Sequence, residues 1–173
     1  IPKKAPFDYY SKDYQKGLQL YTHGVKIMER SEDLLHDAYS FAKGVVESDD
    51  LTLNISRETL QQDRQLRVIS KQINKKINKH LLDLQKNEPE KYSEFFKEFG
   101  NNIKVAIYEA YGSNKEELQD LLLFHSKNED KLISLREYKE NAKSSEENIL
   151  YATGDSLEKI KNSPALAMVD ENS

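Results

Sequence analysis

The chain has 173 residues, with 30 acidic and 26 basic side chains that leave a net charge of -4, and it contains no cysteine. The acidic balance argues against nucleic acid as a partner, and without cysteine neither a disulfide nor a thiolate site can form. No apolar run reaches the ~20 residues needed to cross a bilayer. We therefore expect a cytoplasmic protein without membrane association. The opening Ile1-Pro2 lacks an initiator methionine, which leads us to expect a fragment of a longer chain.

The first predicted element is a strand between Leu18 and Met28. Apolar and polar residues alternate along it, but the phase of the alternation changes at Gly24, which predicts a bulge or bend within one strand. The next segment, "SEDLLHDAYSFAKGVV", repeats apolar residues at steps of three and four. This spacing predicts a helix with one buried face, ended by the polar turn "ESDD".

A long helix is predicted from Leu60 onward, for about seven turns. Its apolar residues keep helical spacing at Leu66, Ile69, Ile73, Ile77, Leu81 and Leu84. Its outer face carries Lys71, Lys75, Lys76 and Lys79. These lysines indicate either an anionic partner or a solvated helix surface, and a solvated surface is the commoner outcome.

Short helices are predicted between Pro89 and Leu122. Pro89 suits a first helical turn, and Gly100 is expected to end that helix. A second helix should end at Gly112, and "SNKE" (113–116) reads as a capping box that opens a third. The first of these helices carries an aromatic stripe, which we expect to be core rather than a ligand surface: Tyr92, Phe95, Phe96 and Phe99.

The last third of the chain shows the pattern of strand, turn and helix that is typical of a sheet covered by helices. A capping box is predicted at Ser134 and Glu137. "NILYATGD" (148–155) predicts a buried strand and a turn, and Asp155 is the expected cap of the helix that follows. Pro164 stands at a further helix entry.

A self-contained active site cannot be assembled from these residues. The four histidines are scattered and show no metal-binding spacing. No nucleophile elbow or phosphate-binding glycine loop occurs. We therefore expect no metal site and no catalysis by the chain alone.

The stretch "LNISRETLQQ" (53–62) contains the best candidate site. Ser56 is a plausible helix N-cap, and Arg57 follows where the helix dipole favours an anion rather than a cation. Gln61 lies four residues later on the same face, and Arg64 extends it. This arrangement either directs a guanidinium at phosphate oxygens or is an exposed arginine that costs a few tenths of a kcal/mol against the dipole.

Several motifs occur in the order and approximate spacing of one family. They are "IPKKAPFD", "GLQLYTHGVKIM", "VVESDDLTLNISRETLQQDRQL", "EKYSEFFKEFG" and "ILYATGDS". Over essentially its whole length the chain resembles the middle domain of the heat-shock protein 90 chaperones, most closely the bacterial type. The resemblance implies an α/β fold with an α-β-α sandwich, a coil of short helices and a second, smaller α-β-α unit. The expected divisions are 1–86, 87–121 and 122–173.

The resemblance also implies a function. The family is an ATP-dependent, homodimeric chaperone in which a middle-domain arginine reaches the γ-phosphate of ATP held with Mg²⁺ in the N-terminal domain, assisted by a glutamine. Their counterparts here are Arg57 and Gln61. The implied partners are client proteins, the chain's own N-terminal ATPase domain and, as a further candidate, a 70-kDa heat-shock-type chaperone. The alternative is a module that only binds clients or a partner chaperone.

The chain departs from the family pattern at two places. Lys26 stands where relatives commonly carry an exposed aromatic residue that is linked to domain packing and to clients, so that role is in doubt here. His36 replaces an expected proline, which concerns only a helix entry.

Overall fold

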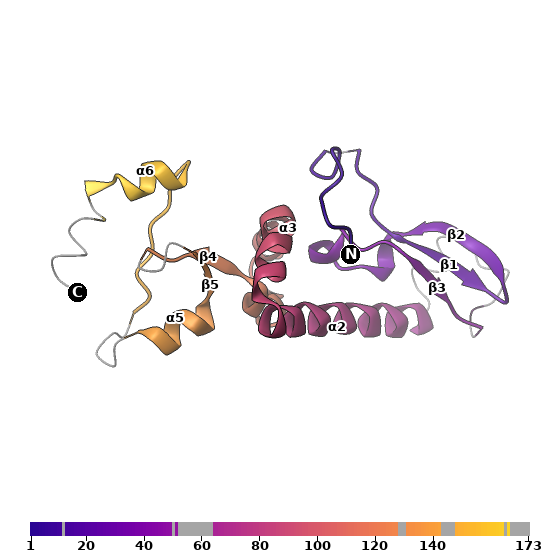
Figure 1. Cartoon of the computed structure of the whole chain (residues 1–173). Coiled ribbons are helices and arrows are strands. Elements are labelled where there is room, and N and C mark those ends of the chain that lie inside the picture. Colours follow the sequence, from indigo (N-terminus) through magenta and orange to yellow (C-terminus); the bar gives the residue numbers. More distant parts are fainter. Residues whose placement is uncertain are drawn as a thin grey trace. The chain divides into compact units, whose positions relative to one another are not determined.

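The computed structural model (Figure 1) describes residues 1–11, 13–49, 51, 64–127, 131–142, 148–164 and 166. It is mixed α/β, with helices and two small sheets, which confirms the predicted class. The chain divides into two compact units, Ile1–Leu123 (unit 1) and Phe124–Ser173 (unit 2).

The sheet of unit 1 has the strand order β2-β1-β3. Strand β1 (Leu18–Thr22) runs antiparallel to β2 (Val25–Ser31) and parallel to β3 (Val45–Glu47). The prediction of one bent strand across Gly24 is wrong, because His23 (φ 47°) and Gly24 (φ 73°) both take positive φ values. Two such residues form the tight turn of a hairpin, and Thr22 pairs with Val25 across it.

The predicted helix after β2 is also wrong. Two single-turn 3-10 helices occur instead, η1 (Glu32–Leu34) and η2 (Asp37–Tyr39). Leu35 between them is extended, and the His36 ring accepts a hydrogen bond from the Ala38 backbone N–H, so a continuous helix cannot form. The apolar spacing nevertheless identified the buried residues, since Leu34, Ala38 and Phe41 are all fully buried.

Helices α2 (Arg64–Asn87) and α3 (Pro89–Glu109) contribute further buried residues to the unit 1 core. The long helix is confirmed from Arg64 onward; its expected start at Leu60 lies outside the described residues. Pro89 occupies the first turn of α3, as predicted. The aromatic stripe is core, as predicted, with exposed fractions of 7% or less at Tyr92, Phe95, Phe96 and Phe99.

Gly100 does not end a helix, because α3 continues through it to Glu109. A Cβ atom at Gly100 would lie 2.7 Å from the Phe96 ring. The glycine therefore makes room for an aromatic ring of the preceding turn. Its place in the sequence reflects packing rather than helix termination.

The segment after α3 differs in detail from the prediction. Helix α4 (Lys115–Leu118) is one turn long and is followed by η3 (Gln119–Leu121). The capping box predicted at Ser113 is wrong, since Asn114 is the N-cap residue and makes no side-chain capping bond. The Asn114 amide instead donates to the Ala106 carbonyl oxygen at 3.1 Å, at the end of α3.

Unit 2 contains most of a two-stranded sheet, β4 (Leu123–His125) with β5 (Leu132–Ser134). Helix α5 (Leu135–Asn141) begins with the predicted capping box. The Ser134 hydroxyl oxygen accepts from the Glu137 backbone N–H at 3.1 Å, and the Glu137 carboxylate accepts from the Ser134 backbone N–H at 2.8 Å.

The buried strand predicted at 148–155 is wrong. Residues 148–155 have no regular secondary structure, and Ile149, Leu150 and Tyr151 are 51%, 64% and 86% exposed. An apolar run becomes a strand only beside the edge of another strand. Helix α6 (Leu157–Lys161) follows with Ser156 as its cap rather than Asp155.

Candidate functional site

The two predicted site residues, Arg57 and Gln61, lie outside the described residues. The structure does describe both attachments of their segment. Leu51 precedes it beyond strand β3, and Arg64 opens helix α2 after it. These attachments show which elements would position the arginine.

The entry attachment is buried and hydrogen-bonded. Thr22, at the end of β1, is fully buried, and Leu51 is 2% exposed. The Thr22 hydroxyl donates to the Leu51 carbonyl oxygen at 2.9 Å. Because a buried carbonyl must be paired, this bond fixes where the chain leaves the sheet.

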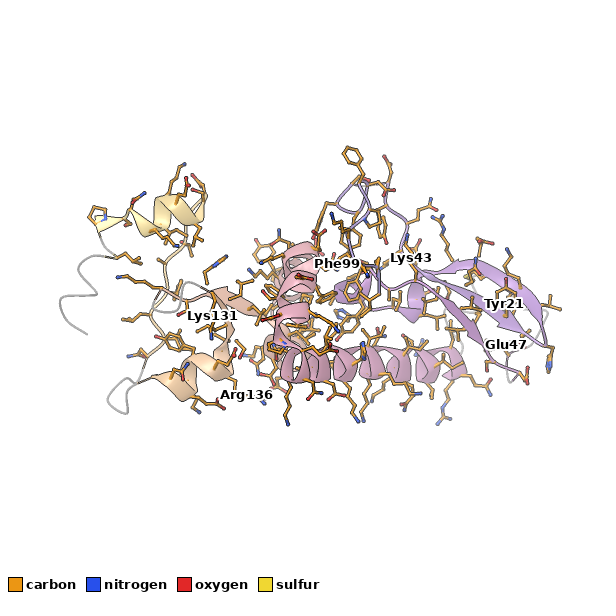
Figure 2. The ribbon with its side chains drawn as sticks, viewed as in Figure 1. Tyr21, Lys43, Glu47, Phe99, Lys131 and Arg136 are labelled. Carbon is orange, nitrogen blue, oxygen red and sulfur yellow. The ribbon has the colours of Figure 1, made fainter. Side chains whose placement is uncertain are left out.

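Backbone and side-chain bonds hold the chain between β3 and Leu51 against the hairpin turn. Ser48 N–H donates to the Tyr21 carbonyl oxygen at 3.1 Å, and Gly24 N–H donates to the Glu47 carboxylate at 2.9 Å. Tyr21 and Glu47 lie opposite each other on β1 and β3, near one end of the sheet (Figure 2). The hairpin turn and the residues that leave β3 are therefore joined to each other by hydrogen bonds.

The exit attachment is the first half of α2. Leu66 is 3% exposed, so the first turn is packed into unit 1. Ser70 donates its hydroxyl hydrogen to the Asp33 carbonyl oxygen at 2.9 Å. One turn later, the Asn74 side chain accepts from the His36 backbone N–H at 2.9 Å. The register of α2 against η1 is thereby fixed.

The first described turn of α2 carries Arg64 and Arg67 and no carboxylate. Arg64 is exposed, and no ion pair among the described residues involves it.

Two residues that support these attachments were not among the predicted site residues. Thr22 holds the entry attachment through the hydroxyl bond to Leu51. The His36 ring accepts from Ala38 N–H through Nδ1 and lies 3.2 Å from the Asn114 amide through Nε2, so it joins three segments of unit 1. A threonine at a strand end and a lone histidine carry no motif, and only the tertiary contacts reveal these roles.

Lys26 lies on β2 and forms an ion pair with Glu29. This hydrogen bond raises the pKa of the Lys26 ammonium and lowers that of the Glu29 carboxyl. Glu29 also accepts from the Gln19 amide at 2.9 Å. The outer surface of the hairpin is thus polar at this position.

Nowhere in the described part of the chain do three or more histidine, acidic or cysteine side chains gather as metal ligands would. Among the same residues, no helix is long and apolar enough to span a membrane.

Comparison with known proteins defines the class. The fold is that of a chaperone middle domain: a solved structure, the middle domain of a heat shock protein of Plasmodium falciparum, matches 99% of this chain and 66% of that chain at a TM-score of 0.80 and 25% identity. The family model described as "Hsp90 protein" matches residues 1–173. The chain therefore belongs to the Hsp90 family.

Among its relatives are bacterial proteins named "Chaperone protein HtpG". Those of Halalkalibacterium halodurans and Bacillus subtilis are each 52% identical over 169 residues, which is 98% of this chain. The chain spans 27% of the length of these relatives.

Proposed function

We propose that this chain supplies Arg57 and Gln61 to ATP hydrolysis in the full-length chaperone, as the family motif implies. The observation that carries the proposal is that both attachments of their segment are fixed. Thr22 is hydrogen-bonded to Leu51 on one side, and the first described turn of α2 is packed through Leu66 on the other. A catalytic group needs such support, since small misplacements sharply reduce the rate.

In this proposal Arg57 acts as an arginine finger. Mg²⁺-bound ATP is held by the N-terminal domain of the full-length protein, and Arg57 approaches the γ-phosphate when the domains close. Its guanidinium stabilises charge on the transferring phosphoryl oxygens. Gln61 assists by hydrogen bonding from the same face. The chain alone hydrolyses no ATP.

The finer architecture and the cellular setting belong to the same proposal. Residues 1–86 and 122–173 form a large and a small α-β-α subdomain, and residues 87–121, which include α3 and α4, connect them. The full-length protein is a cytoplasmic homodimer that assists the folding of clients, with a 70-kDa heat-shock-type chaperone as a candidate partner.

The test is ATP turnover by the full-length chaperone carrying Arg57→Ala. We expect turnover to fall by about 100-fold or more, as after loss of a transition-state donor, while ATP affinity stays within about twofold. Arg67→Ala is the matched control, because Arg67 is an exposed arginine on α2 and its loss changes the charge equally. Unchanged turnover in the Arg57 variant would remove the assignment.

A second candidate function is binding of clients without a role in ATP hydrolysis. Exposed apolar residues favour it: Val25 on β2 is 52% exposed, and Val105 and Tyr108 on α3 are 48% and 83% exposed. Amide hydrogen exchange with and without reduced, alkylated α-lactalbumin tests this function. Protection at β2 and α3 supports it, and unchanged exchange throughout the chain contradicts it.

A further inference from the structure

The exposed side of α2 carries a line of cations. We define the cationic face of α2 as Arg64, Lys71, Lys75, Lys79 and Lys86, all of which are exposed. Steps of seven and four residues along a helix keep side chains on one side. At 1.5 Å per residue the line extends over roughly 33 Å.

Side chains that flank the cationic face, together with the buried side of α2, fix the helix to the core of unit 1, so the cationic face cannot rotate inward. Asn78 donates to the Tyr39 hydroxyl at 2.9 Å and to the Glu117 carbonyl oxygen at 2.6 Å. Gln85 donates to the Asp120 carbonyl oxygen at 3.2 Å. Leu81 is fully buried. In Figure 1, one long side of α2 faces no other element of unit 1.

The cations of this face outnumber the carboxylates of α2 by five to one. Asp83, four residues after Lys79, is the one carboxylate on α2. Among the described residues, no ion pair involves any member of the cationic face. Lysines four residues apart repel each other by about 0.2–0.5 kcal/mol per pair. The arrangement disfavours the isolated helix and favours an anion that spans several lysines.

The geometry points to an acidic polypeptide segment as the occupant of this face: we propose that the cationic face of α2 binds an extended, Asp/Glu-rich stretch of a partner protein. Lys71, Lys75 and Lys79 cover about 12 Å of helix, which matches about four residues of extended chain at ~3.3 Å each. Val68, 55% exposed beside the line, offers an apolar contact.

The same observations disfavour two other anionic surfaces. Nucleic acid binders use aromatic platforms for single strands and a strong basic excess, whereas α2 has no phenylalanine, tyrosine or tryptophan and the chain is acidic overall. A helix that lies on a membrane inserts its apolar face. The apolar face of α2 is packed within unit 1, with Leu66 and Leu81 buried.

The test measures binding of a fluorescein-labelled hexaglutamate peptide to the 173-residue chain by anisotropy at two salt concentrations. We expect saturable binding that weakens as salt rises. Replacing Lys71, Lys75 and Lys79 by glutamate should weaken it by at least tenfold. The matched control replaces Lys4, Lys97 and Lys115 by glutamate. These lysines are exposed on separate elements, and the control should stay within about threefold of the parent chain.

Three outcomes would overturn the proposal. The first is absence of binding, and the second is equal weakening by the two triple variants, which would indicate a non-specific charge effect. The third is tighter binding of a hexathymidine strand or of phosphatidylserine vesicles than of the peptide, which would assign the face to nucleic acid or membrane. Circular dichroism of each variant verifies that α2 remains folded. The proposal is independent of Arg57, because the peptide assay requires no ATP.

Discussion

The two units of the chain use their apolar residues in different ways. In unit 1, aromatic rings from three segments pack together at edge-on or tilted angles: Phe41 lies 5.0 Å from Phe95 and 5.1 Å from Phe99, and Tyr9 lies 5.2 Å from Phe99, between ring centroids. In unit 2, Ile133 is the one buried apolar side chain among the described residues from 124 onward.

This difference separates two sources of stability. Unit 1 has a hydrophobic core of the kind that dominates folding free energy. The described part of unit 2 depends on local features, such as the capping box of α5 and the cap of α6. Segments that bury little apolar surface open locally at a low free-energy cost. We therefore expect unit 1 to unfold cooperatively and unit 2 to contribute little to that transition.

The largest test of this comparison is Phe99→Ala. Phe99 is fully buried and contacts rings from three segments of unit 1. Removal of a buried phenylalanine ring costs about 3–5 kcal/mol of unfolding free energy. Urea denaturation followed by circular dichroism measures the loss.

Leu150→Ala is the matched control in unit 2. Leu150 is 64% exposed, and its truncation should change the unfolding free energy by less than about 0.5 kcal/mol. Similar losses in the two variants would contradict the division between a packed and a locally stabilised unit.

The same division explains what the sequence could predict. The apolar spacing identified α2 and the aromatic core, and the Ser134 box was recognised because a capping box is a local motif. The predictions failed where tertiary contacts decide the local structure. The hairpin at Gly24 depends on its strand pairing. Gly100 was misread for a local reason, because it accommodates the Phe96 ring one turn earlier in the same helix.

The candidate site shows the same limit of local patterns. Arg57 and Gln61 were found through a motif and remain a prediction. The anchors beneath their segment, Thr22 and Leu51, contact each other across residues distant in sequence. No spacing rule in the sequence connects a threonine at the end of β1 to a carbonyl oxygen that follows β3.

Alkaline pH should destabilise unit 1 through its buried tyrosines. Burial raises the pKa of Tyr39 from 10.0 to about 12 and also raises the pKa values of Tyr9 and Tyr92. A raised tyrosine pKa means that the folded state holds the proton more tightly. The resulting stability is complete below pH 10 and is lost as pH rises from 10 toward the folded-state values.

Each of these tyrosines should lower the unfolding free energy above pH 10, with a slope that rises toward about 1.4 kcal/mol per pH unit. Urea titrations at pH 8, 10 and 11 measure the slope. Tyr39→Phe should reduce the slope. A free energy that stays constant to pH 11 would contradict burial of the three rings.

The smallest expected effect concerns unit 2 alone. Ser134→Ala removes the capping acceptor of α5 and leaves the Glu137 backbone N–H without its 3.1 Å partner. Loss of a serine cap costs about 1 kcal/mol. Because α5 lies in the unit with little buried apolar surface, the cost should appear as faster amide exchange in 135–141, with the urea midpoint of unit 1 unchanged. If the unfolding free energy of unit 1 instead fell by the full cost of the cap, the two units would unfold as one. The two units would then differ in structure but not in stability.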